Sequence, residues 1–391
     1  MKVLHVIPSV APDSGGPAQA IIPMCRQLKS QGVDVLLVTT DAGLTTNSPI
    51  RDRVVDYKGV STMFFKSQVG ESFKFSRPMS VWLDRNITKF DLVHVHAIFN
   101  HASIAATRAC QNQAVPYVIR PLGSLDPWSM NQKRFRKQLF WRLSGQNMMH
   151  RAAAVHYTTN AERDSVEQTL RLNHGHVIPL GIEFEPGDCT SQANGLKTLL
   201  SGLDHHPYVL VLSRLHPKKA LDVLIEAFAR VTSNGQFAEW RLVIAGEGPS
   251  DYMQRLRGVA SSENAEARII FPGWLDGENK QFVLRNASLL ALASYQENFG
   301  LCVMEALSYS VPVLISPQVN LADEIKNAGA GWISNVDRSS LEVALSDIFH
   351  NESERAARGR AGKGLSQRFT WDRTATQLIR MYSSITISHG H

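Results

Sequence analysis

Residues 294–309 read Ser-Tyr-Gln-Glu-Asn-Phe-Gly-Leu-Cys-Val-Met-Glu-Ala-Leu-Ser-Tyr, and they join an apolar run at 289–293 to an amphipathic helical pattern. A short apolar run followed at once by a helix is typical of a buried strand in an α/β protein. Gly300 permits a tight turn between the two and leaves the free N–H groups of the helix start facing the strand end. The segment therefore predicts a parallel sheet with an anion-attracting helix start at its edge.

The same alternation of apolar runs and helical patterns extends outward over the whole chain. In the second half it predicts strands at 208–213, 241–245, 269–271, 289–293 and 312–315, with helices at 219–231 and 300–309. In the first half it predicts strands at 2–7, 33–39, 91–96, 117–119 and 153–157, with a helix at 16–30. We therefore expect an α/β protein with two Rossmann-like, doubly wound parallel-sheet domains that face a central cleft.

The length of 391 residues favours two domains, because single hydrophobic cores rarely grow this large. The stretch 187–206 lacks clear periodicity, and we place the junction there. The expected domains are residues 1–186 and 187–370. A C-terminal helical segment at 371–391 is expected to pack back on the first domain.

Composition is that of an ordinary folded protein, with 43% hydrophobic and 19% charged residues. The apolar run after Lys2 is too short for a secretory signal, and no run approaches the roughly 20 residues of a membrane-spanning helix. Cys25, Cys110, Cys189 and Cys302 lie far apart, which argues against a disulfide framework or a zinc site. We expect a cytoplasmic protein.

A net charge of +6 suits an anionic partner such as a nucleoside diphosphate, a lipid surface or a nucleic acid. The sequence contains no RNA-recognition or zinc-finger pattern, so a nucleic-acid partner is not expected.

Glu297 and Glu305 are eight residues apart, which corresponds to about 12 Å at helical rise. That distance suits two carboxylates that bind hydroxyls at opposite ends of one elongated ligand. It is long for a pair sharing one reaction centre, where about 5–9.5 Å is usual in glycosidases. Alternatively, both glutamates are solvated or pair with nearby lysines, and their spacing alone does not decide.

A second group of charges follows the strand at 208–213, in the segment Ser-Arg-Leu-His-Pro-Lys-Lys-Ala-Leu of residues 213–221. Arg214 and Lys219 would emerge at the carboxyl end of that strand. There they could neutralise a diphosphate group that gains negative charge as it departs. The alternative is a solvated basic loop.

Together these segments resemble the family 4 glycosyltransferases (group 1), which are retaining enzymes of the GT-B fold. The matching segments, in the family order, are Gly15-Gly16, 177–183 (VIPLGIE), 213–228 (SRLHPKKALDVLIEAF), 242–249 (LVIAGEGP), 271–275 (FPGWL) and 297–316 (ENFGLCVMEALSYSVPVLIS). The resemblance implies an N-terminal domain that binds the acceptor and a C-terminal domain that binds a nucleotide sugar.

The resemblance also implies roles for individual residues. Arg214, Lys219 and Glu297 would form the catalytic set, with the cations on the diphosphate and Glu297 on hydroxyls of the donor sugar. Glu305 would bind the ribose. The remaining donor contacts implied are Gly15, Gly16, Gly246, Trp274, Leu275, Asn298, Phe299, Gly300 and Leu301. Gly15 and Gly16 would face the diphosphate, and Trp274 and Leu275 the base.

Family members generally act without a metal or other cofactor, and this sequence contains no Asp-x-Asp that would supply a divalent-ion site. The implied reaction is front-face transfer of a hexose with retention. UDP-glucose is the donor we expect, while nothing in these residues separates glucose from galactose or N-acetylglucosamine. The expected acceptor is an exopolysaccharide or lipid-linked glycan precursor.

Two departures from the family pattern concern backbone positions. Ala220 replaces a frequent glycine, and since alanine starts a helix well, little loss is expected. Leu180 replaces a frequent asparagine.

A third departure affects the substrate side. Leu122 stands where many relatives have His or Arg, and Arg120 is the candidate to replace that contact. His94 and His96 share one face of a strand, with His96 nearer its end and the better candidate. The alternative hypothesis for all three histidines, His94, His96 and His101, is that they are hydrogen-bonded core or surface residues. Asp126 is either an acceptor contact or a turn residue before proline.

Segment 132–143 carries five cations, Lys133, Arg134, Arg136, Lys137 and Arg142, interleaved with aromatic and leucine residues. A basic amphipathic helix of this kind fits peripheral contact with the anionic inner face of the plasma membrane. It equally fits a helix with its apolar side in the first domain and its charges in water.

Three other classes of protein remain as alternatives. A nucleotide-sugar epimerase of the same architecture would form product from the donor alone. A non-catalytic sugar-nucleotide-binding protein would transfer nothing. An NAD-dependent dehydrogenase would need Gly-x-Gly-x-x-Gly after the first strand, and residues 8–16 do not supply it.

Overall fold

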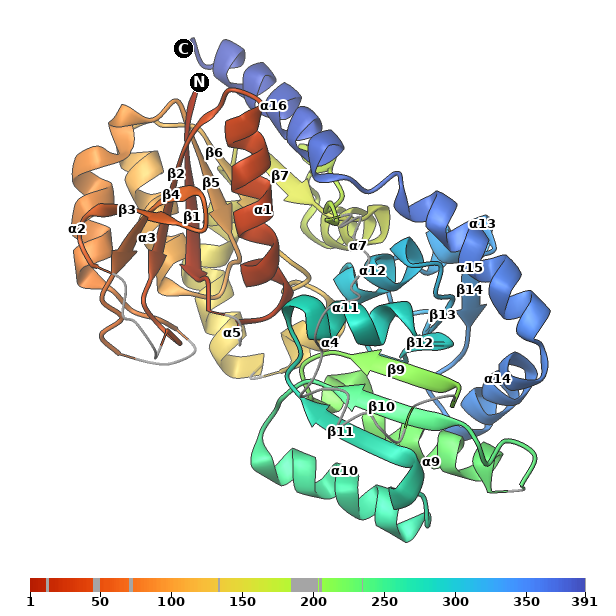
Figure 1. The fold of residues 1–391 in the computed structure, drawn as a ribbon. Helices are drawn as coiled ribbons and strands as arrows, with labels where there is room; N and C mark the ends of the chain where they lie inside the picture. The colour runs from red at the N-terminus through yellow and green to blue at the C-terminus, as the bar shows by residue number, and fades with distance from the viewer. Residues whose placement is uncertain are drawn as a thin grey trace. The chain divides into compact units, whose positions relative to one another are not determined.

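The computed structural model describes residues 1–11, 14–44, 50–69, 73–132, 134–183, 203, 206–233 and 235–390. The chain forms two compact units (Figure 1). Unit 1 comprises Met1–Gly181 and Thr370–His391, and unit 2 comprises Ile182–Phe369. The predicted boundary between residues 186 and 187 lies outside the described residues.

Unit 1 contains an eight-stranded sheet in the order β3-β4-β2-β1-β5-β6-β7-β8. Its strands are β1 (Lys2–Ser9), β2 (Asp34–Thr40), β3 (Val54–Tyr57), β4 (Val60–Phe65), β5 (Leu92–His96), β6 (Tyr117–Arg120), β7 (Ala154–Tyr157) and β8 (Gly175–Val177). The pairs are parallel except for β3 with β4, which form an antiparallel hairpin. The strand order reverses direction between β1 and β5.

The helices of unit 1 cover both faces of this sheet. They are α1 (Gly16–Ser30), α2 (Arg77–Asn86), α3 (His101–Asn112), α4 (Pro127–Asn131), α5 (Arg134–Phe140), α6 (Gln146–His150), α7 (Asn160–Leu170) and α16 (Trp371–Ser388). One sheet face, with Leu4, Val6 and Val93 among its buried residues, belongs to the main apolar core. The alternate residues of the same strands face the other way, and several of them are histidines.

Helix α16 returns to unit 1 and lies along α1 (Figure 1). Gln31, at the end of α1, donates through Nε2 to the backbone oxygen and the carboxylate of Asp372, at 3.0 and 2.8 Å. Thr376 donates to Oε1 of the same glutamine at 3.2 Å. The last helix of the chain is therefore part of the first structural unit.

Unit 2 contains a six-stranded sheet in the order β11-β10-β9-β12-β13-β14, with parallel pairing throughout. The strands are β9 (Tyr208–Leu212), β10 (Arg241–Ala245), β11 (Ile269–Gly273), β12 (Leu289–Leu292), β13 (Val313–Ile315) and β14 (Gly331–Ile333). The helices are α9 (Leu221–Thr232), α10 (Ser250–Ser262), α11 (Gly277–Arg285), α12 (Leu301–Ser308), α13 (Ala322–Ala328), α14 (Arg338–His350) and α15 (Glu352–Ser366).

The predicted class of fold, two doubly wound parallel-sheet domains, is confirmed for each unit. The expectation about Ala220 is corrected. Lys219 ends a 3₁₀ turn (η5, Pro217–Lys219), α9 begins at Leu221, and Ala220 between them has φ of +48°. This left-handed conformation costs a non-glycine residue about 1–2 kcal/mol, so the alanine is strained there and does not simply start a helix.

Candidate active site

Two loops of unit 2 meet where its strand order reverses. Strands β9 and β12 are neighbours at the centre of the sheet, and the chain leaves them toward opposite edges. In open parallel sheets this position creates a crevice beyond the carboxyl ends of the strands, where ligands bind. The backbone N–H of Tyr295, after β12, donates to the carbonyl oxygen of Lys218, after β9, at 2.9 Å. This bond joins the two loops that carry the predicted catalytic residues.

Lys219 and Glu297 form an ion pair across these two loops, with Nζ donating to Oε2. Their side chains are 14% and 20% exposed. Burial by itself would raise the pKa of Glu297. The cations of Lys219 and Lys218 and hydrogen bonds from Lys219 and the Asn298 backbone outweigh it, and the pKa lies below its usual value. Glu297 is therefore ionised at neutral pH and is held beside a lysine.

The backbone around Glu297 is fixed on both sides. Its N–H donates to the carbonyl oxygen of Gln318 and its carbonyl oxygen accepts from the N–H of Asn320, both at 3.0 Å. Gly300 has φ of +71° and immediately precedes α12, as the sequence predicted. The first N–H groups of α12 therefore begin four residues after Glu297, at Leu301, on the same loop.

Glu305 also pairs with a lysine, because Lys280 of α11 donates to its Oε1 at 2.7 Å. Both side chains are about a quarter exposed, at 25% and 24%. The sequence contained no signal for Lys280, since it belongs to no motif and lies 25 residues from its partner. Arg214, in contrast, is exposed in the loop after β9.

The other donor candidates follow β10 and β11. Trp274 is half-buried and Leu275 is buried directly after β11. Gly246 follows β10 with φ of +142°, and a Cβ there would lie 1.8 Å from the carbonyl oxygen of Ser213. Its N–H donates to the carbonyl oxygen of Gly273 at 2.8 Å. The glycine thus lets the three loops after β9, β10 and β11 approach one another, while its contact with substrate stays a prediction.

In unit 1, Gly15 and Gly16 follow β1, where the strand order reverses. Gly15 has φ of +84° and directly precedes α1, whose first residue is Gly16. Gly15 is buried and Gly16 is exposed. The pair therefore marks a helix start at the place where a doubly wound sheet binds ligands. Its contact with a diphosphate stays a prediction.

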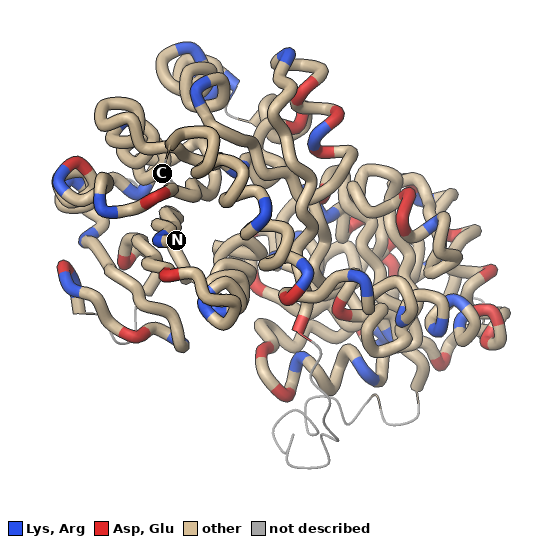
Figure 2. Tube along the Cα trace, turned by 90° about the horizontal axis from the view of Figure 1, so that it is seen from above, with Lys and Arg blue, Asp and Glu red and all other residues tan. Residues whose placement is uncertain are grey.

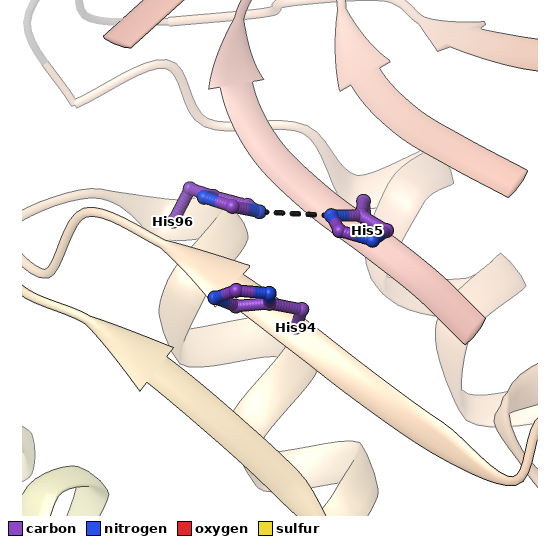
Figure 3. Close-up of side chains that lie close together, drawn as sticks. All are labelled: His5, His94 and His96. Atoms are coloured by element: carbon purple, nitrogen blue, oxygen red, sulfur yellow. Dashed lines mark hydrogen bonds between the residues drawn. The ribbon is translucent and has the colours of Figure 1, made fainter. Parts of the chain in front are cut away.

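His96 lies inside unit 1, with 1% of its surface exposed. His5 of β1 faces it, and the atoms His5 Nδ1 and His96 Nε2 are 3.1 Å apart (Figure 3). His94, paired in register with His5, stacks on His96 with ring centroids 4.3 Å apart. The structure therefore places the predicted sugar-contacting histidine in a buried cluster, which is the alternative that the sequence left open.

The hydrogen bonds of this cluster have one consistent direction. His156 Nε2 lies 2.8 Å from the carbonyl oxygen of Ile178, which can only accept, so this nitrogen carries the proton. His156 Nδ1 must then accept from His94 Nε2 at 3.3 Å, and His94 Nδ1 accepts from the Tyr382 hydroxyl at 2.6 Å. The buried relay thus connects α16 to β5, β7 and the segment after β8.

Within the described residues, His5, His94 and His96 offer ring nitrogens within 4.8 Å of one another. However, both nitrogens of His94 are already engaged, and the Arg120 guanidinium contributes to lowering the pKa of all three histidines. A second cation in the same cavity would be repelled. We therefore assign this group as a hydrogen-bonded core cluster. His101 is also engaged, with Nδ1 accepting from the Ser76 N–H at 3.2 Å.

Arg120 is paired in register with His96 and is 1% exposed. Burial lowers its pKa to about 10, against the opposing influence of Glu162 and Tyr382. Its Nε and Nη2 atoms have no hydrogen-bond partner within the part of the chain that the structure describes. The candidate substitute for the missing family cation is thus buried and retains two free donors.

Glu162 is the residue of unit 1 that the sequence analysis missed. Its buried carboxylate accepts from the N–H of Gly123 at 2.7 Å, and from the N–H and hydroxyl of Thr158 at 2.9 Å each. It thereby fixes the loop in which Leu122 has φ of +59°. The sequence pattern Thr159-x-x-Glu162, which is typical of a helix start, was the available signal, and Thr159 indeed accepts from the N–H of Glu162 at 3.1 Å. Asp126, at the end of that loop, is 6% exposed and precedes α4.

We expect the buried histidines to make unit 1 less stable in acid. Burial, and secondarily Arg120, lowers the pKa of His5 to about 3, and burial lowers those of His94, His96 and His156 well below 6.5. Below about pH 6.5 the unfolded chain therefore binds protons that the folded chain excludes. The free energy of unfolding therefore has its full value above about pH 6.5. As the pH falls below that value, it decreases by about 1.4 kcal/mol per pH unit for each histidine.

Urea unfolding at about pH 7.5 and pH 5.5 measures this loss. The variant His5→Gln keeps a polar side chain at the site but excludes one proton fewer. Its free energy of unfolding should therefore change less with pH, by about 1.4 kcal/mol per pH unit. A matched change at the exposed His350 should leave it as in the parent. A free energy of unfolding that does not change over this range would contradict the burial of neutral histidines.

Comparison with known proteins supports the same interpretation. A model of the glycosyl transferase 4-like domain matches residues 15–181, and a model of group 1 glycosyl transferases matches residues 201–365. D-inositol 3-phosphate glycosyltransferase of Corynebacterium efficiens is 22% identical over 99% of this chain and 95% of its own.

Solved structures share the fold at low sequence identity. Sucrose-phosphate synthase of Thermosynechococcus elongatus has a TM-score of 0.79 at 17% identity and covers 99% of this chain and 100% of its own. HepE of Anabaena, solved in complex with UDP and glucose, has a TM-score of 0.77 at 18% identity, with coverages of 98% and 100%. Two doubly wound units and these matches define a GT-B glycosyltransferase. The chain belongs to the group 1 glycosyltransferases, as its sequence motifs predicted.

Proposed function

We propose that the protein transfers a hexose, with retention of anomeric configuration, from UDP-glucose to a hydroxyl of a polysaccharide or lipid-linked glycan precursor. The observation that carries this proposal is the Lys219–Glu297 pair at the point where the strand order of unit 2 reverses. A cation for a diphosphate and a carboxylate for sugar hydroxyls lie there on adjoining loops. The donor joins a diphosphate to a sugar, so a lysine for the first and a glutamate for the second must lie side by side.

The chemistry follows from the charges that develop during transfer. As the bond between the anomeric carbon and the phosphate oxygen breaks, negative charge grows on the diphosphate, and Lys219 and Arg214 neutralise it. Glu297, released from Lys219 by the incoming ligand, accepts hydrogen bonds from sugar hydroxyls. The start of α12 supplies backbone N–H donors to the phosphates. Glu305 binds the ribose in the same manner: hydroxyls of the ribose replace Lys280 as the donors to its carboxylate.

The acceptor hydroxyl attacks the anomeric carbon from the face that the diphosphate leaves. Its proton passes to the departing phosphate oxygen, so that UDP and the glycoside are the products. Positive charge on the sugar ring peaks between bond breaking and bond formation, beside the Glu297 carboxylate. No metal takes part in this scheme, because the cations and the helix start neutralise the diphosphate.

Relatives guide the choice of donor. HepE was solved with UDP and glucose, which supports a uridine nucleotide and a hexose for a chain of the same fold. Trp274 and Leu275, half-buried and buried after β11, offer an apolar surface for the base. The acceptor is proposed, from the family resemblance, to bind the loops of unit 1, where Glu162 holds Gly123 in the loop after β6.

A donor panel tests the proposal. The protein is incubated with UDP-glucose, UDP-galactose, UDP-N-acetylglucosamine or GDP-mannose, with and without glycan acceptors, and nucleotide release is measured. We expect acceptor-dependent release of UDP from UDP-glucose, unaffected by a chelator, and an α-glycoside by NMR. A β-glycoside, a requirement for metal or preference for GDP-mannose would contradict it. Conversion of the donor sugar without acceptor would identify an epimerase.

A further inference from the structure

An exposed apolar stripe lies on the helical segment that follows α4. Helix α5 continues through a π-helical turn (η3, Trp141–Gly145) into α6. Phe140 faces inward and packs on Phe99, with ring centroids 5.1 Å apart. On the outside, Phe135, Leu139 and Leu143 are 87%, 60% and 74% exposed. Residues four apart in a helix lie on one side, so these three form a continuous stripe.

The exposed charges on the segment that carries this stripe have one sign. Arg134, Arg136 and Arg142 are exposed on the same segment. Lys137 is turned inward instead, with Nζ donating to the carbonyl oxygen of Ser129 at 2.6 Å. Over much of the tube in Figure 2, Lys and Arg are interspersed with Asp and Glu. The sequence contains no Asp or Glu from residue 127 to residue 161, and from residue 92 to residue 161 its one acidic residue is Asp126. The stripe therefore lies in a stretch with arginines and no compensating acid.

We propose that this segment docks on an anionic phospholipid bilayer. Phe135, Leu139 and Leu143 would enter the boundary between headgroups and acyl chains, and the arginines would contact lipid phosphates. Interfacial helices bind in this way, with affinity from buried apolar area and from attraction to anionic lipids. No helix among the described residues is long and apolar enough to cross a membrane, so the contact is peripheral.

The charges favour a bilayer over a second copy of the chain as the occupant of the stripe. A two-fold contact would place the same arginines of both copies against one another, and like charges oppose association. A nucleic acid would gain little from Leu139 and Leu143, which offer neither stacking nor hydrogen bonds. An anionic membrane satisfies the apolar stripe and the arginines together.

Vesicle co-sedimentation of the full chain tests the proposal. The vesicles contain phosphatidylcholine alone, or phosphatidylcholine with one third phosphatidylglycerol. We expect binding to the anionic vesicles that weakens at high salt, and little binding to the neutral ones. Equal binding to both kinds of vesicle, or no binding to either, would overturn it.

A variant of the stripe separates apolar insertion from general attraction. The triple variant Phe135→Ser, Leu139→Ser and Leu143→Ser should bind anionic vesicles about tenfold more weakly than the parent. Its apolar surface no longer leaves water when the segment docks. Because the three side chains are exposed, folding is expected to persist, and an unchanged Tm checks it. The matched control, Val343→Ser with Ile387→Ser, removes exposed apolar side chains elsewhere and should bind like the parent.

A charge variant completes the test. Arg134→Gln with Arg136→Gln should weaken binding by about 25-fold, because each cation near an anionic surface contributes roughly fivefold. Arg360→Gln with Lys363→Gln, on the exposed side of α15, changes the net charge equally and should have a much smaller effect. Equal losses in both variants would refute a localised surface. A dimer in sedimentation velocity that the stripe variant abolishes would assign the stripe to a second copy.

Discussion

Lys219→Ala is expected to lower kcat for sugar transfer by about 10²–10³, the usual effect of removing one preorganised group that stabilises charge in a transition state. The lysine pairs with Glu297 on the loops that follow β9 and β12, where the diphosphate is proposed to depart. Its contribution grows as the leaving group becomes more negative, so KM should change less than kcat. Steady-state kinetics with the donor identified by the panel measures both constants.

Stability measurements separate this catalytic role from a structural one. Lys219→Ala leaves the mostly buried Glu297 carboxylate without its cation, which should lower the free energy of unfolding by about 1–3 kcal/mol. Adding Glu297→Gln removes that charge and should restore part of the stability without restoring transfer. Lys326→Ala, at an exposed lysine of α13, serves as the control. If Lys219→Ala lowered the stability but left kcat within a few-fold of the parent, Lys219 would be a structural residue.

Gly246→Ala is expected to lower the free energy of unfolding by about 3 kcal/mol or more, at the upper end of single substitutions. The new Cβ would lie 1.8 Å from the carbonyl oxygen of Ser213 and 2.9 Å from its carbon. Both are backbone atoms of the loop that continues to Arg214 and Lys219, so neither can move aside as a flexible side chain would. The φ of +142° adds strain for any residue with a side chain.

Gly258→Ala provides the matched control for this prediction. Gly258 lies inside α10, and a Cβ there meets nothing within 4 Å. Alanine is favoured over glycine in a helix, so this variant should gain about 0.5–1 kcal/mol. Urea unfolding of both variants tests the contrast. Similar effects of the two substitutions would show that the close approach at residue 246 is not maintained in solution.

The two sheets were predictable because their central strands are short apolar runs between helices. Strand β4 (VSTMFF), with five of its six residues buried, was also missed although it is largely apolar, whereas the missed strands β3 and β14 lacked that signal. Strand β3 alternates exposed and half-buried residues at the sheet edge, and only its turn, with Lys58 at φ +52° and Gly59 at φ +83°, marks the hairpin. Strand β14 has three residues, too few for a periodic pattern. Ala220 was misjudged because helix propensity does not reveal a left-handed backbone.

The candidate residues of the two units differed in how much their sequence revealed. The donor segment is local: Glu297, Gly300 and the start of α12 lie within a few consecutive residues. The environment of His96 and Arg120 depends on distant segments instead. The hydroxyl that caps the histidine relay belongs to Tyr382, 288 residues after His94. No strand pattern could show that α16 would cover that face of the sheet.

The return of the last helix has a consequence for the order of folding during synthesis. Unit 1 is built from both ends of the chain, whereas unit 2 is one continuous segment, Ile182–Phe369. Unit 2 can therefore fold cotranslationally, while α16 is still being synthesised, as contiguous domains generally do. Unit 1 emerges first but must wait for α16 to supply Tyr382 to His94. Until then His94 lacks the hydroxyl from which its Nδ1 accepts in the folded protein, so the histidine relay is completed only when α16 has been synthesised.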